Sequence, residues 1–369
     1  MKILAIETSC DETACAVLEA HAVKAVVDFS ILSNQISSQV KIHAPFGGVV
    51  PNLAKREHQK NLPILLERAL KESKTKKPDV LAVTYGPGLE PALWVGINFA
   101  KELSRKWGVP LIPVNHLEGH IYSAFMRNFK FSISNFEFFP LLTLIVSGGH
   151  TELVLTRKHL DYKILGETKD DAAGEAFDKV ARMLGLGYPG GPLLAKIANR
   201  LKAQNSKFKV SLPRPMLHSG DLYFSFSGLK TAVLYLLEEL RPRYSMKDIR
   251  ARVASEFQNA VVEVLVRKTL GAVKKHYPKT VTIGGGVAAN KMLRKELGRS
   301  LQKLPFEVHY LAPDLVFTGD NAAMIAVPAY FRFKAKKFRQ NSESLKARGG
   351  LKLSKTSQNW DTEKYARRV

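Results

Sequence analysis

The sequence has 369 residues, 45% of them hydrophobic and 24% charged, a composition that excludes whole-chain disorder and the collagen and coiled-coil classes. Only two cysteines are present, Cys10 and Cys15, so a disulfide scaffold and a four-cysteine zinc knuckle are excluded. Lys and Arg number 56 against 33 Asp and Glu, and the net charge of +23 points to a polyanionic partner, nucleic acid first.

No segment has the length of a membrane span or the pattern of a secretory signal. The longest apolar stretch, 138–146, is interrupted by Pro140 and Thr143, whereas a bilayer needs about 20 apolar residues. With few cysteines, the chain also suits a reducing compartment. We therefore expect a soluble protein of the cytoplasm that does not bind membranes.

The first half of the chain begins with a predicted β-hairpin. Apolar runs at 4–6 and 14–18 flank a polar turn at 7–13, which is the pattern of two strands joined by a functional loop. The elements expected next are a basic helix at 57–72, a strand at 80–83, a helix at 92–107 and a strand at 111–114. Alternating strands and helices indicate an α/β architecture.

The second half repeats this pattern about 140 residues later. Apolar runs at 142–146 and 152–155 flank the polar turn 147–151. The elements expected after it are helices at 171–185 and 252–275, a strand at 281–283 and a helix from about 290. One hairpin in each half predicts two related α/β lobes. Residues 332–369 carry twelve Lys and Arg against three acids, which predicts a mostly flexible basic tail.

A metal site is suggested by the segment NHLEGH at 115–120. His116 and His120 are four residues apart, so on a helix both imidazoles share one face and can meet one ion. Asp320, in a loop just before a helix, is the candidate third ligand, and two His plus one carboxylate leave positions open for a substrate oxygen. The glutamate of the zincin pattern is missing. Two ordinary polar helix residues remain the alternative.

Glycine-rich turns after two strands suggest contact with a phosphate. Ser147, Gly148 and Gly149 follow one strand, and three glycines at 284–286 follow another, where backbone N–H groups can approach a nucleotide closely. A Walker-type phosphate loop is absent. Asp178 is either a sugar-binding carboxylate or a helix-capping acid.

The turn of the first hairpin carries two neighbouring carboxylates, Asp11 and Glu12. Paired carboxylates in a tight loop can orient a metal, a water or an amine, so these two residues are the candidate catalytic pair. Ordinary turn chemistry is the alternative, because Asp is common in turns.

Taken in order, these segments resemble a known family. The matching motifs lie at 6–13, 43–51, 115–120, 147–151, 174–179, 188–192, 224–230, 284–290 and 320–321. Together they resemble the bacterial TsaD family, the tRNA N6-adenosine threonylcarbamoyltransferases, over about residues 1–331. The segment FGGVVP at 46–51 is similar to the bacterial or organellar branch.

The resemblance implies an actin-like, two-lobe α/β fold of the ASKHA superfamily. The implied divisions are a first lobe at 1–138, a second at 139–326, and a terminal helix returning to the first lobe with the basic tail at 327–369. It also implies transfer of the threonylcarbamoyl group from threonylcarbamoyl-AMP to N6 of the adenosine beside the anticodon in tRNAs reading ANN codons. AMP is the leaving group.

The resemblance further implies roles for single residues. His116, His120 and Asp320 would bind one divalent metal, Fe²⁺ rather than Zn²⁺, with Asp11 and Glu12 nearby. The phosphate and carbamoyl region would be held by Ile145, Val146, Ser147, Gly148 and Gly149, and the adenosine by Asp178, Gly191 and Asn290. The implied partners are tRNA, an inactive TsaB-like paralogue on the first lobe and a small TsaE-like ATPase.

Two departures and three alternatives accompany this interpretation. Ala195 stands where many relatives carry an acid, which removes one expected sugar contact, and the basic tail extends past the usual end of the family. The alternatives are a metallopeptidase, a small-molecule kinase of the actin-like superfamily and a non-catalytic tRNA-binding protein.

Overall fold

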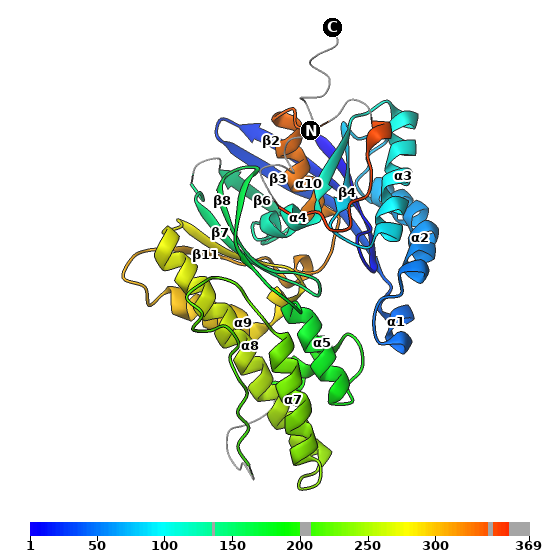
Figure 1. Cartoon of the computed structure of the whole chain (residues 1–369). Helices are drawn as coiled ribbons and strands as arrows, with labels where there is room; N and C mark the ends of the chain where they lie inside the picture. Colours follow the sequence, from blue (N-terminus) through cyan, green and yellow to red (C-terminus); the bar gives the residue numbers. More distant parts are fainter. Residues whose placement is uncertain (135–136, 200–207, 339–341, 354–369) are drawn as a thin grey trace.

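The protein is described here by a computed structural model, which covers residues 1–134, 137–199, 208–338 and 342–353. Two mixed β-sheets form the centres of two lobes (Figure 1). The first sheet contains β1 (Lys2–Glu7), β2 (Glu12–Val23), β3 (Val26–Ser38), β4 (Val80–Gly86), β5 (Leu111–Asn115) and β6 (Lys130–Ser134). The second contains β7 (Leu141–Val146), β8 (Thr151–Lys158), β9 (Asp161–Glu167), β10 (Thr280–Gly284) and β11 (His309–Leu311).

The two sheets share one topology. Their strand orders are β5-β4-β1-β2-β3-β6 and β11-β10-β7-β8-β9. In each, an antiparallel hairpin is followed by a third antiparallel strand, while two further strands pair in parallel on the other side of the first strand. The first sheet only adds β6 at its edge. The predicted duplication of a hairpin, and with it two related α/β lobes, is confirmed.

Helices cover both faces of the first sheet. One face packs against α2 (Pro51–Glu72) and α3 (Glu90–Trp107), whose buried residues recur every three or four positions. The other face packs against α4 (His116–Ser123) and α10 (Ala323–Lys334), which also contact apolar residues of the second sheet. These two helices therefore lie between the sheets and join the lobes in one apolar core.

The remaining helices belong mainly to the second lobe (Figure 1). They are α5 (Ala173–Met183), α6 (Gly190–Ala198), α7 (Ser227–Leu240), α8 (Met246–His276), η2 (Gly286–Ala289) and α9 (Lys291–Leu301). Short turns complete the described chain: α1 (Val40–His43), η1 (Ala44–Phe46), η3 (Leu315–Phe317) and η4 (Ser342–Ser344). Within the described residues, no helix combines the length and apolar character that a bilayer crossing demands.

Every strand and helix predicted from the sequence is present, with longer bounds in most cases. The helix predicted at 57–72 starts at Pro51, the one at 252–275 starts at Met246, and the second hairpin strand runs on to Val23. The predicted basic segment around α2 is solvated: its exposed cations are Lys55, Arg56, Lys60, Arg68, Lys71, Lys74, Lys76 and Lys77.

The beginning of the predicted flexible tail is packed instead. Arg332 is fully buried, and the segment 342–353, here called the C-terminal strap, runs back over the first lobe with Leu345 and Leu353 buried. The N–H of Arg348 donates to the carbonyl of Tyr85 at 2.9 Å. The strap is held in place because its leucines pack against apolar residues of the fold. The sequence pattern alone does not reveal these contacts. The rest of the predicted tail, 339–341 and 354–369, lies outside the described residues.

Candidate active site

Strand β5 leads directly into α4, which carries two histidines. The side chain of Asn115 caps this helix by accepting the N–H of Leu117 at 2.8 Å. His116 and His120 are one turn apart and both buried, with their ring centroids 4.6 Å apart. The predicted placement of both imidazoles on one helical face is therefore confirmed.

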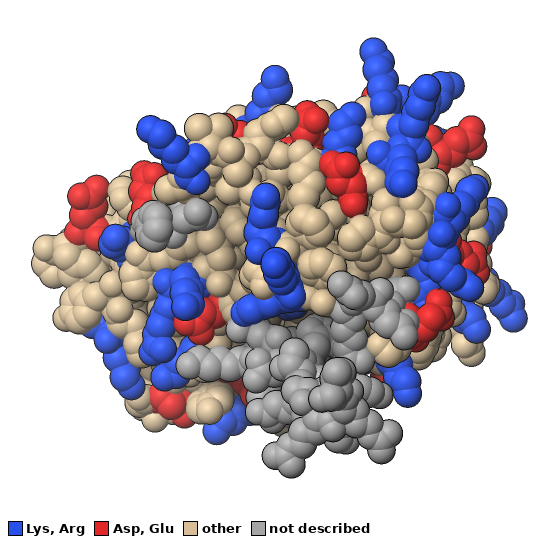
Figure 2. Space-filling view, turned by 90° about the horizontal axis from the view of Figure 1, so that it is seen from above, with Lys and Arg blue, Asp and Glu red and all other residues tan. Residues whose placement is uncertain are grey.

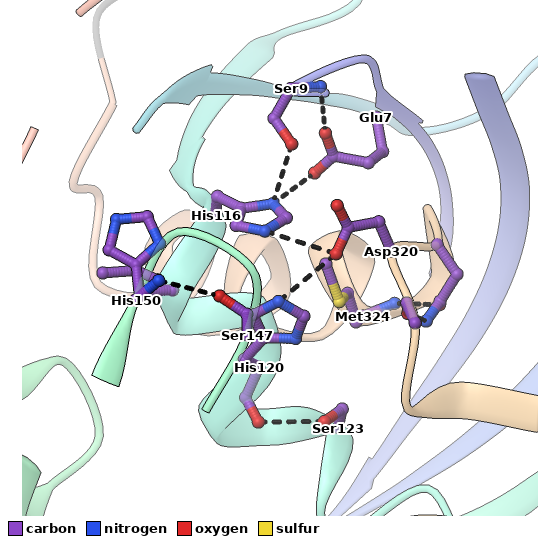
Figure 3. A network of polar contacts seen from close by, with 12 residues as sticks. Glu7, Ser9, His116, His120, Ser123, Ser147, His150, Asp320 and Met324 are labelled. Atoms are coloured by element: carbon purple, nitrogen blue, oxygen red, sulfur yellow. Dashed lines mark hydrogen bonds and ion pairs between the residues drawn. The ribbon is translucent and has the colours of Figure 1, made fainter. Parts of the chain in front are cut away.

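Asp320 reaches the same point from the loop before α10 (Figure 3). Its Oδ1 atom lies 3.4 Å from Nε2 of His116 and 3.3 Å from Nε2 of His120. One ligand atom from each of the three residues falls within 4.8 Å of the other two. Residues about 200 positions apart thus form a cluster able to hold one metal ion.

The donor set of this cluster fits a divalent transition metal. Nδ1 of His120 is buried and lacks a hydrogen-bond partner among the described residues, and Nε2 has only its contact with Asp320, although buried polar atoms normally have a partner. Burial opposes charge on Asp320, yet the two imidazoles beside it hold the pKa of its carboxyl well below the usual range. Two imidazoles and an ionised carboxylate are a facial ligand set that Fe²⁺ or Zn²⁺ accepts.

Glu7 is a contributor to the site that our sequence analysis did not assign. It is the last residue of β1 and is fully buried. Its Oε2 atom lies 2.9 Å from Nδ1 of His116 (Figure 3). The same oxygen accepts the hydroxyl of Thr84 at 2.7 Å. A carboxylate on the far ring nitrogen fixes a histidine's tautomer and leaves Nε2 toward the ion. The sequence feature that could have identified Glu7 is an acidic residue directly after the apolar run 3–6.

The candidate catalytic pair lies beside this cluster. Asp11 ends the β1–β2 turn, defined as residues 8–11, and Glu12 begins β2. Burial, together with the negative charges of Asp320 and Asp11, raises the pKa of Glu12 to about 9. A further negative charge on Glu12 is therefore disfavoured beside Asp320 and Asp11, and a cation at this place would relieve that repulsion.

A cavity of about 600 Å³ opens in the second lobe. Four of the predicted nucleotide-binding residues line it: Gly148, Asp178, Gly191 and Asn290. A volume of this size suits a nucleoside or a similar small ligand. Ala195 also lines it, so the position noted for its missing acid faces the cavity.

Two of these lining side chains also have structural partners. Asp178 Oδ1 accepts the N–H groups of Gly190 and Gly191 at 2.8 and 3.1 Å, which anchors the start of α6. Asn290 Oδ1 caps α9, and its amide donates to Gln258 Oε1 at 2.9 Å. Asp178 and Asn290 therefore stabilise the wall of the cavity in addition to facing the cavity itself.

The loop after β7 lies between the cavity and the metal cluster. Gly148 lines the cavity, while strand β7 before the loop contacts α4. Burial and the neighbouring His116 and His120 lower the pKa of His150 to about 4. The loop is closed by the N–H of Ser147, which donates to the carbonyl of His150 at 2.8 Å. Ile145 and Val146 are fully buried strand residues, whereas Gly148 and Gly149 are exposed.

Gly284 at the end of β10 allows the second lobe to approach α4. A Cβ atom there would lie 2.3 Å from the carbonyl oxygen of His120. We expect Gly284→Ala to push the backbones apart and to cost about 1–3 kcal/mol of unfolding free energy in urea titrations. Gly228→Ala, at a helical site with open space around it, is the control. Equal stability of the two variants would contradict this close contact.

Sequence comparisons agree with this geometry. The family profile described as "TsaD: tRNA N6-adenosine threonylcarbamoyltransferase" matches residues 30–327. The chain belongs to the TsaD family. A tRNA N6-adenosine threonylcarbamoyltransferase of Desulfitobacterium hafniense is 47% identical over 92% of this chain and 94% of that protein. One of Thermosipho africanus is 46% identical over 90% and 95%.

The predicted membership in a bacterial family of tRNA-modifying transferases is thus confirmed, and the transferase interpretation is favoured over the peptidase and kinase alternatives. Among solved structures, full-length HypF in a phosphate- and nucleotide-bound form matches with a TM-score of 0.57 and 14% identity. The match covers 90% of this chain but 46% of HypF, so this chain spans about half its length. This likeness concerns the fold, which agrees with the predicted two-lobe actin-like architecture.

Proposed function

We propose that this TsaD-family chain transfers the threonylcarbamoyl group of threonylcarbamoyl-AMP to N6 of the adenosine beside the anticodon in tRNAs that read ANN codons. The observation that carries the proposal is the loop 147–150, because Gly148 lines the nucleotide-sized cavity and strand β7 before the loop contacts α4, which carries His116 and His120. A ligand with an adenylate at one end and a carbamoyl group at the other fits that arrangement.

The reaction forms one bond and breaks one. The N6 nitrogen attacks the carbamoyl carbon, an N–C bond forms, and the C–O bond to the phosphate breaks, so that AMP leaves with the electron pair. The N6 nitrogen loses a proton in the process. Because an exocyclic amine is a poor nucleophile, positioning and electrostatic stabilisation carry most of the rate enhancement.

We assign the metal to His116, His120 and Asp320, with Fe²⁺ preferred to Zn²⁺ and with Glu7 orienting His116. A divalent ion there supplies Lewis-acid polarisation of a substrate oxygen. Asp11 and Glu12 are the proposed catalytic pair. Glu12, whose pKa is raised to about 9, holds a proton at neutral pH, so Asp11 is the proposed acceptor of the proton that N6 releases.

The other proposed contacts follow from the loops. The segment of Ile145, Val146, Ser147, Gly148 and Gly149 is proposed to hold the phosphate and carbamoyl region. Its exposed members, Gly148 and Gly149, offer the backbone N–H groups, which bind anions at such turns. Asp178, Gly191 and Asn290 hold the adenosine, which is supported by their place in the cavity wall.

The proposed partners are tRNA, a TsaB-like paralogue on the first lobe and a small TsaE-like ATPase. Support for tRNA comes from the net charge of +23 and from the Lys and Arg side chains of the upper face, which gather toward the α2 and α3 side in Figure 2. The free thiols of Cys10 and Cys15 fit the cytoplasm. We keep 1–138, 139–326 and 327–369 as the proposed divisions of the chain.

The decisive experiment follows labelled threonine. The purified chain is mixed with its two partner proteins, metal, threonylcarbamoyl-AMP and tRNA, and the label in tRNA is counted. We expect label in tRNAs that read ANN codons and none in a tRNA with another base beside the anticodon. Absence of label with competent partners, together with cleavage of a peptide or phosphorylation of a small molecule, would reject the transferase.

The end of the chain is proposed to add nonspecific affinity for tRNA. Residues 354–369 hold four Lys and Arg against two acids. We expect their removal, with the packed strap left intact, to weaken tRNA binding and to reduce the slope of log K against log salt by about 1–3. A binding constant and salt slope equal to those of the full chain would contradict this role.

A further inference from the structure

Four buried polar side chains lie beneath the β1–β2 turn and outside both the metal cluster and the cavity wall. They are Thr13, Gln39, His43 and His58, each at most 1% exposed. Thr13 is on β2, Gln39 precedes α1, His43 ends α1, and His58 is on the buried face of α2. Because buried polar groups destabilise a protein unless they are paired, such a cluster calls for an explanation.

The donor and the acceptor of each hydrogen bond among these groups can be assigned in turn, starting from Val50. The N–H of Val50 donates to Nδ1 of His43 at 3.3 Å, so the ring proton of His43 is on Nε2. His43 Nε2 therefore donates to Gln39 Oε1 at 3.0 Å. The amide end of Gln39 then faces His58 Nδ1 at 3.3 Å and donates to it.

The last link reaches the turn that carries Asp11. With its Nδ1 accepting from Gln39, and from the Thr13 hydroxyl at 2.8 Å, His58 has its proton on Nε2 and donates to the carbonyl of Cys10 at 3.0 Å. Burial lowers the pKa of His58, which keeps the ring neutral with one proton. The backbone N–H of Gln39 also donates to the carbonyl of Asp11 at 2.9 Å.

The other end of the chain of hydrogen bonds lies in segment 40–50, which leads to the N-terminus of α2. Val50 is the residue that precedes this helix. Within the segment, the carbonyl of Gly47 accepts a hydrogen bond from the guanidinium of Arg182 on α5. Segment 40–50 therefore contacts the second lobe, on the helix that also carries Asp178.

We propose that His43, Gln39 and His58 are positioning residues. They hold the β1–β2 turn, and with it Asp11 and Glu12, in place beside the metal cluster, and they connect this turn to segment 40–50. The proposal rests on the proposed transferase function. It adds a structural reason for the three residues, none of which is among the cavity-lining residues or in the metal cluster. His43 orients the amide of Gln39, Gln39 sets the ring proton of His58, and His58 holds the backbone that carries the carboxylates.

Kinetics of conservative and non-conservative variants test the positioning. We expect His58→Leu to lower kcat of threonylcarbamoyl transfer by about 100-fold, with the KM for threonylcarbamoyl-AMP unchanged, because a displacement near 1 Å has effects of this size. His58→Gln keeps an N–H donor and should recover most of kcat. His21→Leu, at an exposed histidine of β2, is the matched control and should not change kcat.

Two measurements on the protein itself do not depend on activity. Nitrogen-15 NMR of the intact chain should show His43 and His58 neutral, both with the proton on Nε2. Hydrogen exchange should be faster at residues 9–13 in His43→Leu, although His43 does not contact them, and unchanged in His21→Leu. Both measurements remain informative if the wild-type chain transfers nothing. That result would reject the proposed transferase function but not the positioning role.

Three outcomes would overturn the proposal. One is a kcat of His58→Leu equal to that of the wild type, or a loss that appears only in KM. Another is an Nδ1 proton on either histidine. The third is unchanged exchange of the turn in His43→Leu, which would leave His58 as a local packing residue; if His58→Leu does not fold, the NMR and the His43 variant still decide.

Discussion

Replacing both His116 and His120 by alanine should remove the bound metal and lower threonylcarbamoyl transfer by about 1,000-fold or more, since Lewis-acid stabilisation is worth several kcal/mol. The variant removes both imidazoles from Asp320 and leaves its carboxylate beside Asp11 and Glu12 with no cation to balance it. The measurements are metal content after gel filtration and label transferred to tRNA.

The control for this variant replaces two exposed histidines, His21→Ala and His309→Ala, which lie far along the chain from α4. It should retain both metal and transfer. If the double variant of the cluster loses metal but keeps full transfer, the metal is structural and the assignment of Lewis-acid chemistry is wrong. If it keeps the metal, the three residues are not its ligands.

Arg332→Met should destabilise the chain by about 3–5 kcal/mol, because it leaves a buried carboxylate unpaired. Arg332 on α10 and Glu118 on α4 are both fully buried and form a two-pronged ion pair, with nitrogen–oxygen distances of 2.8 and 2.6 Å. The free energy of unfolding in urea is the measurement. The loss should also weaken metal binding, since this pair joins α4 to the helix that follows Asp320.

A double variant separates pairing from packing. Glu118→Leu with Arg332→Met removes both charges from the core, so it should be more stable than Arg332→Met alone. The comparison with an exposed pair is Arg243→Ala, which loses its contact with Glu239 and should change stability by less than about 0.5 kcal/mol. A double variant no more stable than the single one would show that packing, not the stranded charge, sets the loss.

The sequence predicted those parts of the site that depend on local spacing. His116 and His120 share a helical face whatever the rest of the fold, and Asp320 stands out as an acid in a loop before a helix. Glu7 could not be assigned the same way. Its partner is 109 positions away, and only the fold shows that the end of β1 lies against the start of α4.

Strand β3 was not predicted, whereas helix α10 was expected without a periodic signal. Strand β3 alternates buried Val27, Phe29 and Ile31 with more exposed residues, so its period of two was readable in the sequence. Helix α10 was expected from the loop at Asp320 and from the family resemblance, but periodicity could not give its bounds, because nearly all of its residues from Ala323 to Arg332 are buried. A helix between two sheets has no polar face, and therefore no helical periodicity of hydrophobic residues.

The position of α10 also affects how this protein can be made. Helix α10 covers one face of the first sheet, whose first two strands lie at residues 2–23. This helix is synthesised only after the second lobe. The first sheet is complete at Ser134, and about 190 residues follow before α10 begins at Ala323, so part of its apolar face stays uncovered while they are synthesised. Asp320 arrives at the same late stage. His116, His120 and Asp320 are therefore present together only when synthesis of the chain is nearly finished.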